Sequence, residues 1–382
     1  MSRASSRVTP LRSEPHSIAV TGSDGFIGRN LVIRLKERGF TTQPVNRRTQ
    51  PEELKSIIGE SDAIFHLAAA NRPSDWRDFE RSNCDLTRTI AKAIADAKTK
   101  PLVVFSSSVR SGEPGDYGRT KRISEEILLD LAAKGAATTA VVRLPNVFGK
   151  WAQPNYNSAI ATFCHNLARG LPIAIDDPEA PLSLLYIDDL VDQFLDLLAV
   201  PPTDSGLVEP KNVHHTTVGH VARFIATLAE ARRVGSVEAV GSGLERALYA
   251  TLISSLPPGD FSYPLAPHMD NRGSFTEFLK TPTSGQTSVL TAEPGATRGG
   301  HYHHSKVEKF LIVQGEAKFR FRNILDGAIH EIDASGASPV VVETIPGWTH
   351  DLTNVGDEVL IAVIWANERF DRERPDTIGL PL

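Results

Sequence analysis

Tyr117 and Lys121 are the first residues whose types and spacing could do chemistry. They lie four positions apart, so they share one face of a helix, and a serine run, Ser106–Ser108, precedes them. A phenol has an ordinary pKa near ~10, and a neighbouring ammonium favours the phenolate. We therefore expect Lys121 to lower the pKa of Tyr117, so that the phenol can protonate a carbonyl oxygen that a serine hydroxyl orients. A plain surface helix is the alternative for this pair taken alone.

Four residues further along the chain have the types that bind a metal ion. His301 and His303 alternate on a predicted strand, so their side chains point to one face, and Glu308 lies on the next strand. With His350 they offer three imidazoles and one carboxylate, which suit a divalent zinc, nickel, iron or manganese ion. A histidine-rich loop without a metal is the alternative. His304 is not one of the four predicted ligands, and three roles remain open for it: a base, a hydrogen-bond donor to a ligand, or a surface residue.

A glycine-rich loop follows the first apolar segment of the chain. The stretch TGSDGFIG places its glycines directly after a predicted strand and at the start of a helix. Glycines there allow a tight turn and let the backbone approach a pyrophosphate that rests on the helix N-terminus. A plain glycine turn is the alternative. The cofactor contacts predicted in this loop are Gly22, Ser23, Gly25, Phe26, Ile27 and Gly28.

Basic residues end the next predicted strand, where the ribose of a dinucleotide would lie. Asn46, Arg47 and Arg48 follow the segment FTTQPV. An acidic residue there would bind a free 2′-hydroxyl, whereas an arginine accommodates a 2′-phosphate. We therefore expect NADP(H) rather than NAD as the cofactor, with a solvated basic turn as the alternative for either arginine.

The order of the predicted elements places these groups in two domains. From residue 17 onwards short apolar segments alternate with helical patterns, which predicts a Rossmann-like α/β domain with a doubly wound parallel sheet. The stretch SSLPPGDFSYPLAP is rich in proline, glycine and serine, and beyond it short strands predict an all-β barrel or jelly roll. We expect a disordered tail over 1–16, a nucleotide-binding domain over 17–256 and a β domain over 262–382.

The composition excludes several classes of protein. Of 382 residues, 41% are hydrophobic and 23% are charged, which is typical of a soluble globular protein. The net charge of −5 and the scattered basic residues argue against a nucleic-acid surface or a polybasic membrane patch. No apolar segment approaches the roughly 20 residues that span a bilayer, so we expect no membrane insertion. The two cysteines, Cys84 and Cys164, lie in predicted helices and favour a reducing cytoplasm.

Residues 16–256 resemble an extended short-chain dehydrogenase/reductase of the branch that acts on nucleotide sugars. The matching segments are TGSDGFIG, DAIFHLAAA, SSS, YGRTK, RLPNVFG and LYIDDL. The resemblance implies that Ser108 is the catalytic serine, with Ser107 as the fallback, beside Tyr117 and Lys121. It also implies cofactor contacts at Leu67, Ala68, Ala69, Tyr117, Lys121 and Pro145.

The residues after the serine run restrict the class of reaction that the chain could catalyse. Sugar 4,6-dehydratases that resemble this fold carry an acidic pair there, which removes one proton and delivers another. This chain has Val109 and Arg110 instead, so a dehydratase is disfavoured. A 4-epimerase keeps NAD bound, whereas a preference for NADPH fits net reduction. We therefore favour a reductase of a 4-keto sugar.

The C-terminal region resembles a cupin. The first cupin motif, G-x5-H-x-H-x4-E-x6-G, is complete, and His350 with Asn354 has the H-x3-N spacing of the second. In the second motif Pro346 lies next to Gly347 rather than two residues before it, so we expect a slightly different turn with His350 retained as a ligand. The segment 270–277 resembles the opening of the deoxysugar 3,5-epimerases, with a salt-bridged turn as the alternative.

The whole arrangement resembles the bifunctional C3-epimerase/C4-reductases of bacterial capsule biosynthesis. The segments NRPS, LPNVFGKW, PNYNSAIATFC, DFSYP and RGSFTEFLKTP carry this resemblance. It implies a UDP-2-acetamido-2,6-dideoxy-hexos-4-ulose substrate and a UDP-2-acetamido-2,6-dideoxy-L-talose product on the route to UDP-N-acetyl-L-fucosamine. It further implies a homodimer and a bound divalent metal, for which zinc is favoured.

Carbonyl chemistry gives a reason for two such sites on one chain. A proton on a sugar carbon becomes labile only beside a carbonyl, and a metal ion can polarise that carbonyl. C3 of a 4-keto sugar can therefore be inverted before C4 is reduced and not afterwards, so we expect the metal site to act first. The alternatives are a single-activity ketoreductase or epimerase with a structural cupin, and a non-enzymatic protein that binds NADP or a sugar.

Overall fold

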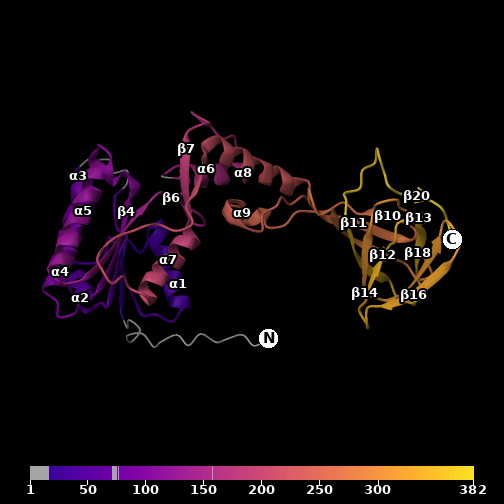
Figure 1. Ribbon diagram of the computed structural model, residues 1–382, viewed down its shortest axis with the longest axis horizontal. Helices are drawn as coiled ribbons and strands as arrows, with labels where there is room; N and C mark the ends of the chain where they lie inside the picture. The colour runs from indigo at the N-terminus through magenta and orange to yellow at the C-terminus, as the bar shows by residue number, and fades with distance from the viewer. Residues whose placement is uncertain (1–16, 71–74, 76, 157) are drawn as a thin grey trace. The chain divides into compact units, whose positions relative to one another are not determined.

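A computed structural model describes residues 17–382 apart from 71–74, 76 and 157 (Figure 1). The predicted tail over 1–16, the NRPS segment and Asn157 therefore lie outside the described residues. The chain divides into two compact units, the first made of residues up to 225 together with 247–256 and the second of 226–246 together with 257–382. The segment 226–246, which the sequence assigns to the first domain, belongs to the second unit.

A parallel sheet forms the centre of the first unit. Its strand order is β2-β1-β3-β4-β5-β8, and every neighbouring pair is parallel. Strands β1, β3 and β4 are buried along their whole length, as expected for a sheet that helices cover on both faces. The strands are β1 (Ile18–Thr21), β2 (Thr42–Val45), β3 (Ala63–His66), β4 (Leu102–Ser108), β5 (Thr138–Leu144) and β8 (Gly206–Val208). The predicted Rossmann-like fold is thereby confirmed.

Helices pack on both faces of this sheet (Figure 1). Helices α2 (Pro51–Glu60), α4 (Leu86–Ala95) and α5 (Asp116–Ala133) cover one face, and α1 (Phe26–Glu37) and α7 (Ile187–Ala199) cover the other. The apolar side chains of α2, α4 and α5 form one core with the buried residues of β3 and β4. The loops after parallel strands all leave from the carboxyl edge of the sheet, which is where open α/β sheets bind ligands.

The apolar segment TTAVVRLPNVFG predicts one continuous strand, and the structure shows two strands instead. Strand β5 ends at Leu144, and β6 (Asn146–Phe148) belongs to a separate sheet with β7 (Pro181–Tyr186) and β9 (His214–Thr217). Pro145 between them has no N–H to donate to a sheet, so the chain changes sheets at that residue.

The remaining helical elements lie between β3 and the first strand of the second unit. They are α3 (Arg77–Phe79), the π-helix η1 (Glu80–Asp85), the 3₁₀ helix η2 (Val109–Gly112), α6 (Ala159–Leu167), α8 (Val218–Arg233), α9 (Gly243–Ser254) and the 3₁₀ helix η3 (Pro258–Asp260). Both cysteines are buried, Cys84 in η1 and Cys164 in α6. No helix among the described residues is both long enough and apolar enough to cross a membrane.

Two antiparallel sheets form the second unit, with strand orders β10-β11-β12-β19-β14-β17 and β16-β15-β18-β13-β20. Buried and partly exposed residues alternate along β12 and β19, so one face of that sheet packs into the core. The strands are β10 (His268–Asp270), β11 (Gly273–Lys280), β12 (Gln286–Ala292), β13 (Thr297–Tyr302), β14 (Glu308–Gln314), β15 (Glu316–Asn323), β16 (Ile329–Ser335), β17 (Val341–Glu343), β18 (Trp348–Asn354), β19 (Leu360–Ala366) and β20 (Ile378–Gly379). The predicted all-β jelly roll is thereby confirmed.

Candidate functional site

The glycine loop lies between β1 and α1 and can adopt its path only with glycine at two positions. Gly22 has a φ of +69°, and a Cβ there would lie 2.8 Å from the backbone of Ala68. A Cβ on Gly28 would collide with the carbonyl oxygen of Gly22. Helix α1 begins after Gly25 without a side-chain cap, and Ser23, Phe26 and Ile27 lie in the same turn. This backbone arrangement fits the pyrophosphate of a dinucleotide.

The other predicted cofactor residues lie in the loops at the same sheet edge. Asn46, Arg47 and Arg48 follow β2, and both guanidinium groups are exposed. The side chain of Asn46 accepts a 2.9 Å hydrogen bond from the N–H of Arg48, which fixes the turn. Leu67, Ala68 and Ala69 follow β3, and Pro145 follows β5.

Tyr117, Lys121 and Ser108 come together where β4 ends and α5 begins. Ser108 is the last residue of β4, and Tyr117 lies in the first turn of α5. The ammonium of Lys121 is 3% exposed and donates a 2.7 Å hydrogen bond to the carbonyl oxygen of Ser106. Burial lowers the pKa of Lys121 to about 8, against the opposing charge of Glu125.

The expected direction of the pKa shift at Tyr117 is wrong. Burial raises the pKa of Tyr117, and the hydrogen bond with Ser108 and the charge of Arg110 oppose this effect without reversing it. The ammonium of Lys121 donates its hydrogen bond to the backbone of Ser106. The phenol therefore holds its proton at neutral pH, which suits a proton donor.

The two candidate serines have different partners. Ser107 donates a short hydrogen bond to Glu125, and that carboxylate also forms two bonds with Arg143, of 2.7 and 3.0 Å. Burial raises the pKa of Glu125, but these bonds outweigh that effect and hold the pKa below its usual range. Ser108 instead hydrogen bonds with Tyr117, which favours it over Ser107 as the residue that faces a substrate. The sequence analysis missed Glu125, although it lies one helical turn after Lys121 on the same face of α5.

A buried histidine beneath this site was also missed. His66, at the end of β3, lies 2.8 Å from the hydroxyl of Thr21 and 2.9 Å from that of Thr87. Burial, and then the charge of Lys121, lower its pKa to about 3, so the ring is neutral. The hydroxyl of Thr21 also accepts hydrogen bonds from the N–H groups of Leu67 and Ala68. These bonds connect the end of β1 to the loop after β3.

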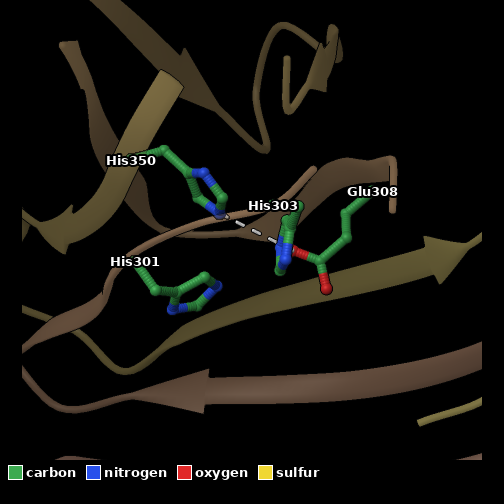
Figure 2. Close-up of side chains that lie close together, drawn as sticks. All are labelled: His301, His303, Glu308 and His350. Atoms are coloured by element: carbon green, nitrogen blue, oxygen red, sulfur yellow. Dashed lines mark hydrogen bonds and ion pairs between the residues drawn. The ribbon is translucent and has the colours of Figure 1, made fainter. Parts of the chain in front are cut away.

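The four predicted metal ligands converge in the second unit (Figure 2). His301 comes from β13, Glu308 begins β14 and His350 lies in β18. One ligand atom from each of the four residues lies within 4.8 Å of those from all the others. Strand β13 ends at Tyr302, so the expectation that His303 shares a strand with His301 is wrong. The ring of His303 nevertheless lies beside those of His301 and His350.

The protonation and burial of this cluster fit a divalent ion. Burial lowers the pKa of His301 to about 4, so its ring is neutral at pH 7. Burial raises the pKa of Glu308. The nearby His303, His350 and Lys306 outweigh that effect and hold the pKa well below its usual range. The Nε2 atom of His350 is buried, lies 3.7 Å from a carboxylate oxygen of Glu308, and has no hydrogen-bond partner among the described residues. Such an atom is rare in folded proteins, and a metal ion would satisfy it.

The turn of the second cupin-like motif keeps His350 in place. Gly347 has a φ of +79°, and its N–H donates a 2.9 Å hydrogen bond to the carbonyl oxygen of His303. Residue His301 also pairs with His350 across β13 and β18, next to a register shift after Gly299. The turn around Pro346 thus connects the two segments that carry the histidines.

A cavity of about 590 Å³ adjoins the cluster at Glu308. It is lined by cationic and acidic side chains together with apolar ones, including Lys280, Lys306, Arg372, Glu277 and Phe275. Within the segment 270–277, Asp270 binds Arg272 at 2.6 Å and Arg298 at 3.1 Å and so forms the salt-bridged turn that was the alternative. Glu277, from the same segment, faces the cavity.

His304 lies outside the cluster. It is exposed, and its ring contacts that of Tyr302 edge-on at 5.4 Å. The sequence left three roles open for this residue, and its position is that of a surface residue.

Comparisons with known proteins match both units. The NAD dependent epimerase/dehydratase family matches residues 18–206, and the polysaccharide biosynthesis C-terminal domain matches 268–378. The chain is 45% identical over 362 residues to UDP-2-acetamido-2,6-beta-L-arabino-hexul-4-ose reductase from Pseudomonas aeruginosa, which covers 94% of this chain and 97% of that protein.

Solved structures agree with these matches. The capsular polysaccharide assembling protein CapF from Staphylococcus aureus has a TM-score of 0.89 at 37% identity, over 96% of this chain and 100% of that one. MoeE5 in complex with UDP-glucose and NAD has a TM-score of 0.54 at 21% identity, over 63% of this chain and 98% of that one, and shares the fold alone.

The fold and the matches together define a nicotinamide-dependent epimerase/dehydratase unit fused to a polysaccharide biosynthesis C-terminal domain. The chain belongs to the same family as the Pseudomonas reductase and CapF, the UDP-sugar epimerase/reductases of capsule biosynthesis. The family that the sequence motifs predict is thereby confirmed.

Proposed function

We propose that the chain inverts C3 of UDP-2-acetamido-2,6-dideoxy-hexos-4-ulose in its β unit and then reduces C4 with NADPH in its α/β unit. The product would be UDP-2-acetamido-2,6-dideoxy-L-talose, on the path to UDP-N-acetyl-L-fucosamine. The observation that carries the proposal is the four-residue donor cluster, in which the buried Nε2 of His350 has no hydrogen-bond partner among the described residues. The same chain carries a Ser–Tyr–Lys group whose serine and lysine are buried and whose tyrosine is half-buried. The name of the Pseudomonas relative, a reductase of a UDP-linked 4-ketose, supports the class of substrate.

In the reductase site, the chain's own residues hold the ketone and supply a proton. NADPH, when bound along the glycine loop, supplies the hydride. Tyr117 gives its proton to the C4 oxygen, because burial keeps the phenol protonated until the oxygen gains negative charge. Ser108 donates to the same oxygen and orients it, and Lys121 places a cation beneath the site that stabilises the phenolate left behind. Arg47 and Arg48 would bind the 2′-phosphate, which is the basis for NADPH over NAD.

In the β unit, His301, His303, Glu308 and His350 would hold a divalent ion, with zinc favoured. That ion supplies Lewis-acid polarisation of the C4 carbonyl, which makes the C3 proton labile. The adjoining cavity is large enough for a sugar. Its Lys280 and Lys306 pair with Glu277 and Glu308, so Arg372 is the cation there that would attract an anionic nucleotide.

The assembly and location form part of the same proposal. We propose a homodimer in the cytoplasm, with domains over 17–256 and 262–382. The homodimer is inferred from the family likeness, and the cytoplasm from the two cysteines, which are both buried and unpaired.

The direct test is to incubate the purified protein with the ketone made by a UDP-GlcNAc dehydratase/epimerase and to read the product by NMR. With NADPH we expect an alcohol with inverted C3, and without NADPH an unreduced ketone that has lost its original C3 configuration. An alcohol that keeps the original C3 configuration would refute the epimerase half. Absence of NADPH oxidation would refute the reductase half.

A further inference from the structure

The last residues of the chain lie along the strands that carry two of the metal ligands. Strand β20 pairs antiparallel with β13, with Gly379 opposite His301 and Ile378 opposite Tyr302. The N–H of Leu380 donates a 2.9 Å hydrogen bond to the carbonyl oxygen of Gly300. The carbonyl oxygen of Leu380 in turn accepts a short hydrogen bond from the hydroxyl of Thr349, directly before His350 in β18. This C-terminal strap, residues 376–381, thus touches the backbone around both ligands.

Asp376, at the start of the strap, fixes the ring of His303. Its backbone carbonyl oxygen forms a short hydrogen bond with Nδ1 of that ring. A carbonyl oxygen can only accept, so Nδ1 must carry a proton, and in the neutral ring the lone pair that could bind a metal ion is then on Nε2. Nε2 is the atom that faces the cluster, 3.4 Å from the carboxylate of Glu308. His303 is 1% exposed and lies beyond the end of β13, so this bond holds a ring that no strand positions.

The side chain of Asp376 closes the loop between two ligands. Its carboxylate accepts hydrogen bonds from the N–H groups of His304 at 2.9 Å, Ser305 at 2.7 Å and Lys306 at 2.8 Å. It also accepts a 3.0 Å bond from the hydroxyl of Ser305. This loop connects His303 to Glu308, so the carboxylate sets the path of the backbone between them.

We propose that the C-terminal strap is a built part of the metal site and that Asp376 is a positioning residue for the ion. The inference rests on the metal-binding half of the proposed function. Asp376 itself contributes no atom to the cluster. It acts by holding the tautomer and orientation of His303 and the closed form of the loop 304–306. Groups that hold a metal-binding histidine in this way commonly change the metal affinity by roughly 10- to 100-fold when they are lost.

The test compares the affinity of the full chain for Zn²⁺ in the wild type and in Asp376→Ala, by competition with a chromophoric chelator. We expect Asp376→Ala to bind Zn²⁺ roughly 10- to 100-fold more weakly. Asp376→Asn keeps one acceptor oxygen and should fall between the two proteins. Asp371→Ala is the matched control, because Asp371 lies in the same segment but caps only the N–H of Glu373, and it should keep the wild-type affinity.

A second readout separates positioning from general stability. With Co²⁺ in place of Zn²⁺, we expect the visible absorption bands of Asp376→Ala to shift. Without the carboxylate, residue 376 is no longer anchored to the loop 304–306, so its backbone carbonyl oxygen no longer holds the ring of His303 in one orientation. Equal Zn²⁺ affinity and equal Co²⁺ spectra in Asp376→Ala and the wild type would overturn the inference, even if the variant melts at a lower temperature. A wild-type protein that binds no Zn²⁺ would instead refute the metal half of the proposed function.

Discussion

The reductase site and the metal site differ in how their polar groups are satisfied. In the first, each group has a protein partner: Lys121 donates to the carbonyl of Ser106, Ser107 binds Glu125, and Tyr117 bonds with Ser108. In the second, three histidines and a carboxylate point at one another, and the buried Nε2 of His350 has no hydrogen-bond partner among the described residues. The first set is therefore satisfied within the fold, whereas the second keeps a buried nitrogen that the proposed ion would satisfy.

Because of this difference, we expect substitutions to affect the two sites in different ways. In the reductase site, a change at Tyr117 leaves the bonds of Lys121 to Ser106 and of Ser107 to Glu125 in place, because neither bond involves the phenol. A ligand cluster depends on every member, because each contributes one bond to the same ion. We therefore expect changes at the reductase site to affect chemistry without affecting assembly, and changes at the metal site to affect occupancy first.

Loss of His350 should have the largest effect. We expect His350→Ala to lower the metal content of the purified protein from about one ion per chain to near zero, because one of four ligands is gone. Reduction should continue and give an alcohol that is not inverted at C3. Metal analysis and NMR of the product check these outcomes. His215→Ala, at an exposed histidine that bonds only with Ser183, should change neither, and full metal content in His350→Ala would contradict the assignment.

Loss of the Tyr117 hydroxyl should stop reduction but spare the metal site. We expect Tyr117→Phe to slow NADPH oxidation with the 4-keto sugar by roughly 1000-fold, within the usual range for a lost general acid. Its metal content and its exchange of the C3 proton should equal those of the wild type. Tyr249→Phe, on α9, is the control. A Tyr117→Phe protein that reduces the ketone at the full rate would refute the assigned role.

The buried Lys121 should make stability depend on pH. Its pKa is about 8 in the folded protein against an ordinary value of 10.5, so between these values the unfolded chain binds more protons than the folded one. The free energy of unfolding should therefore rise with pH between about 8 and 10.5, by up to about 3 kcal/mol from this group. Lys121→Met should lack that rise, and denaturant titrations of both proteins across this range measure it. If the free energy of unfolding changed with pH in the same way in both proteins, Lys121 would not be the buried group whose pKa is lowered.

The exposed arginines after β2 should give the smallest effect. We expect the double variant Arg47→Ala, Arg48→Ala to raise the KM for NADPH by roughly tenfold and to leave that for NADH nearly unchanged, because only the 2′-phosphate loses its cations. Arg38→Ala, at the end of α1, is the control. Equal losses with both cofactors would remove the basis for an NADPH preference.

Local sequence patterns predicted the parts of each site that lie close together in the chain. The glycine loop, the Tyr117–Lys121 pair and the His301–Glu308 segment are short motifs whose spacing reflects one turn, one helix face or one short loop between two strands. The break between β5 and β6 at Pro145 could also be predicted from the sequence, because proline cannot donate to a sheet, although the apolar pattern alone indicates one strand.

Other features depend on contacts between distant residues and leave no local pattern. Asp376 lies 73 residues from the ring of His303 that it fixes, and Arg143 lies 18 residues from Glu125. The direction of the pKa shift at Tyr117 follows from burial, which no spacing reveals.

Exchange with solvent tests the proposed order of the two reactions most directly. The ketone is incubated in D₂O without NADPH, with the metal-loaded protein and with protein stripped by a chelator, and deuterium at C3 is read by NMR. We predict deuterium at C3 with the metal-loaded protein and none with the stripped protein. Equal incorporation by both, or an inverted alcohol from stripped protein once NADPH is added, would contradict the claim that the metal site acts on the ketone before it is reduced.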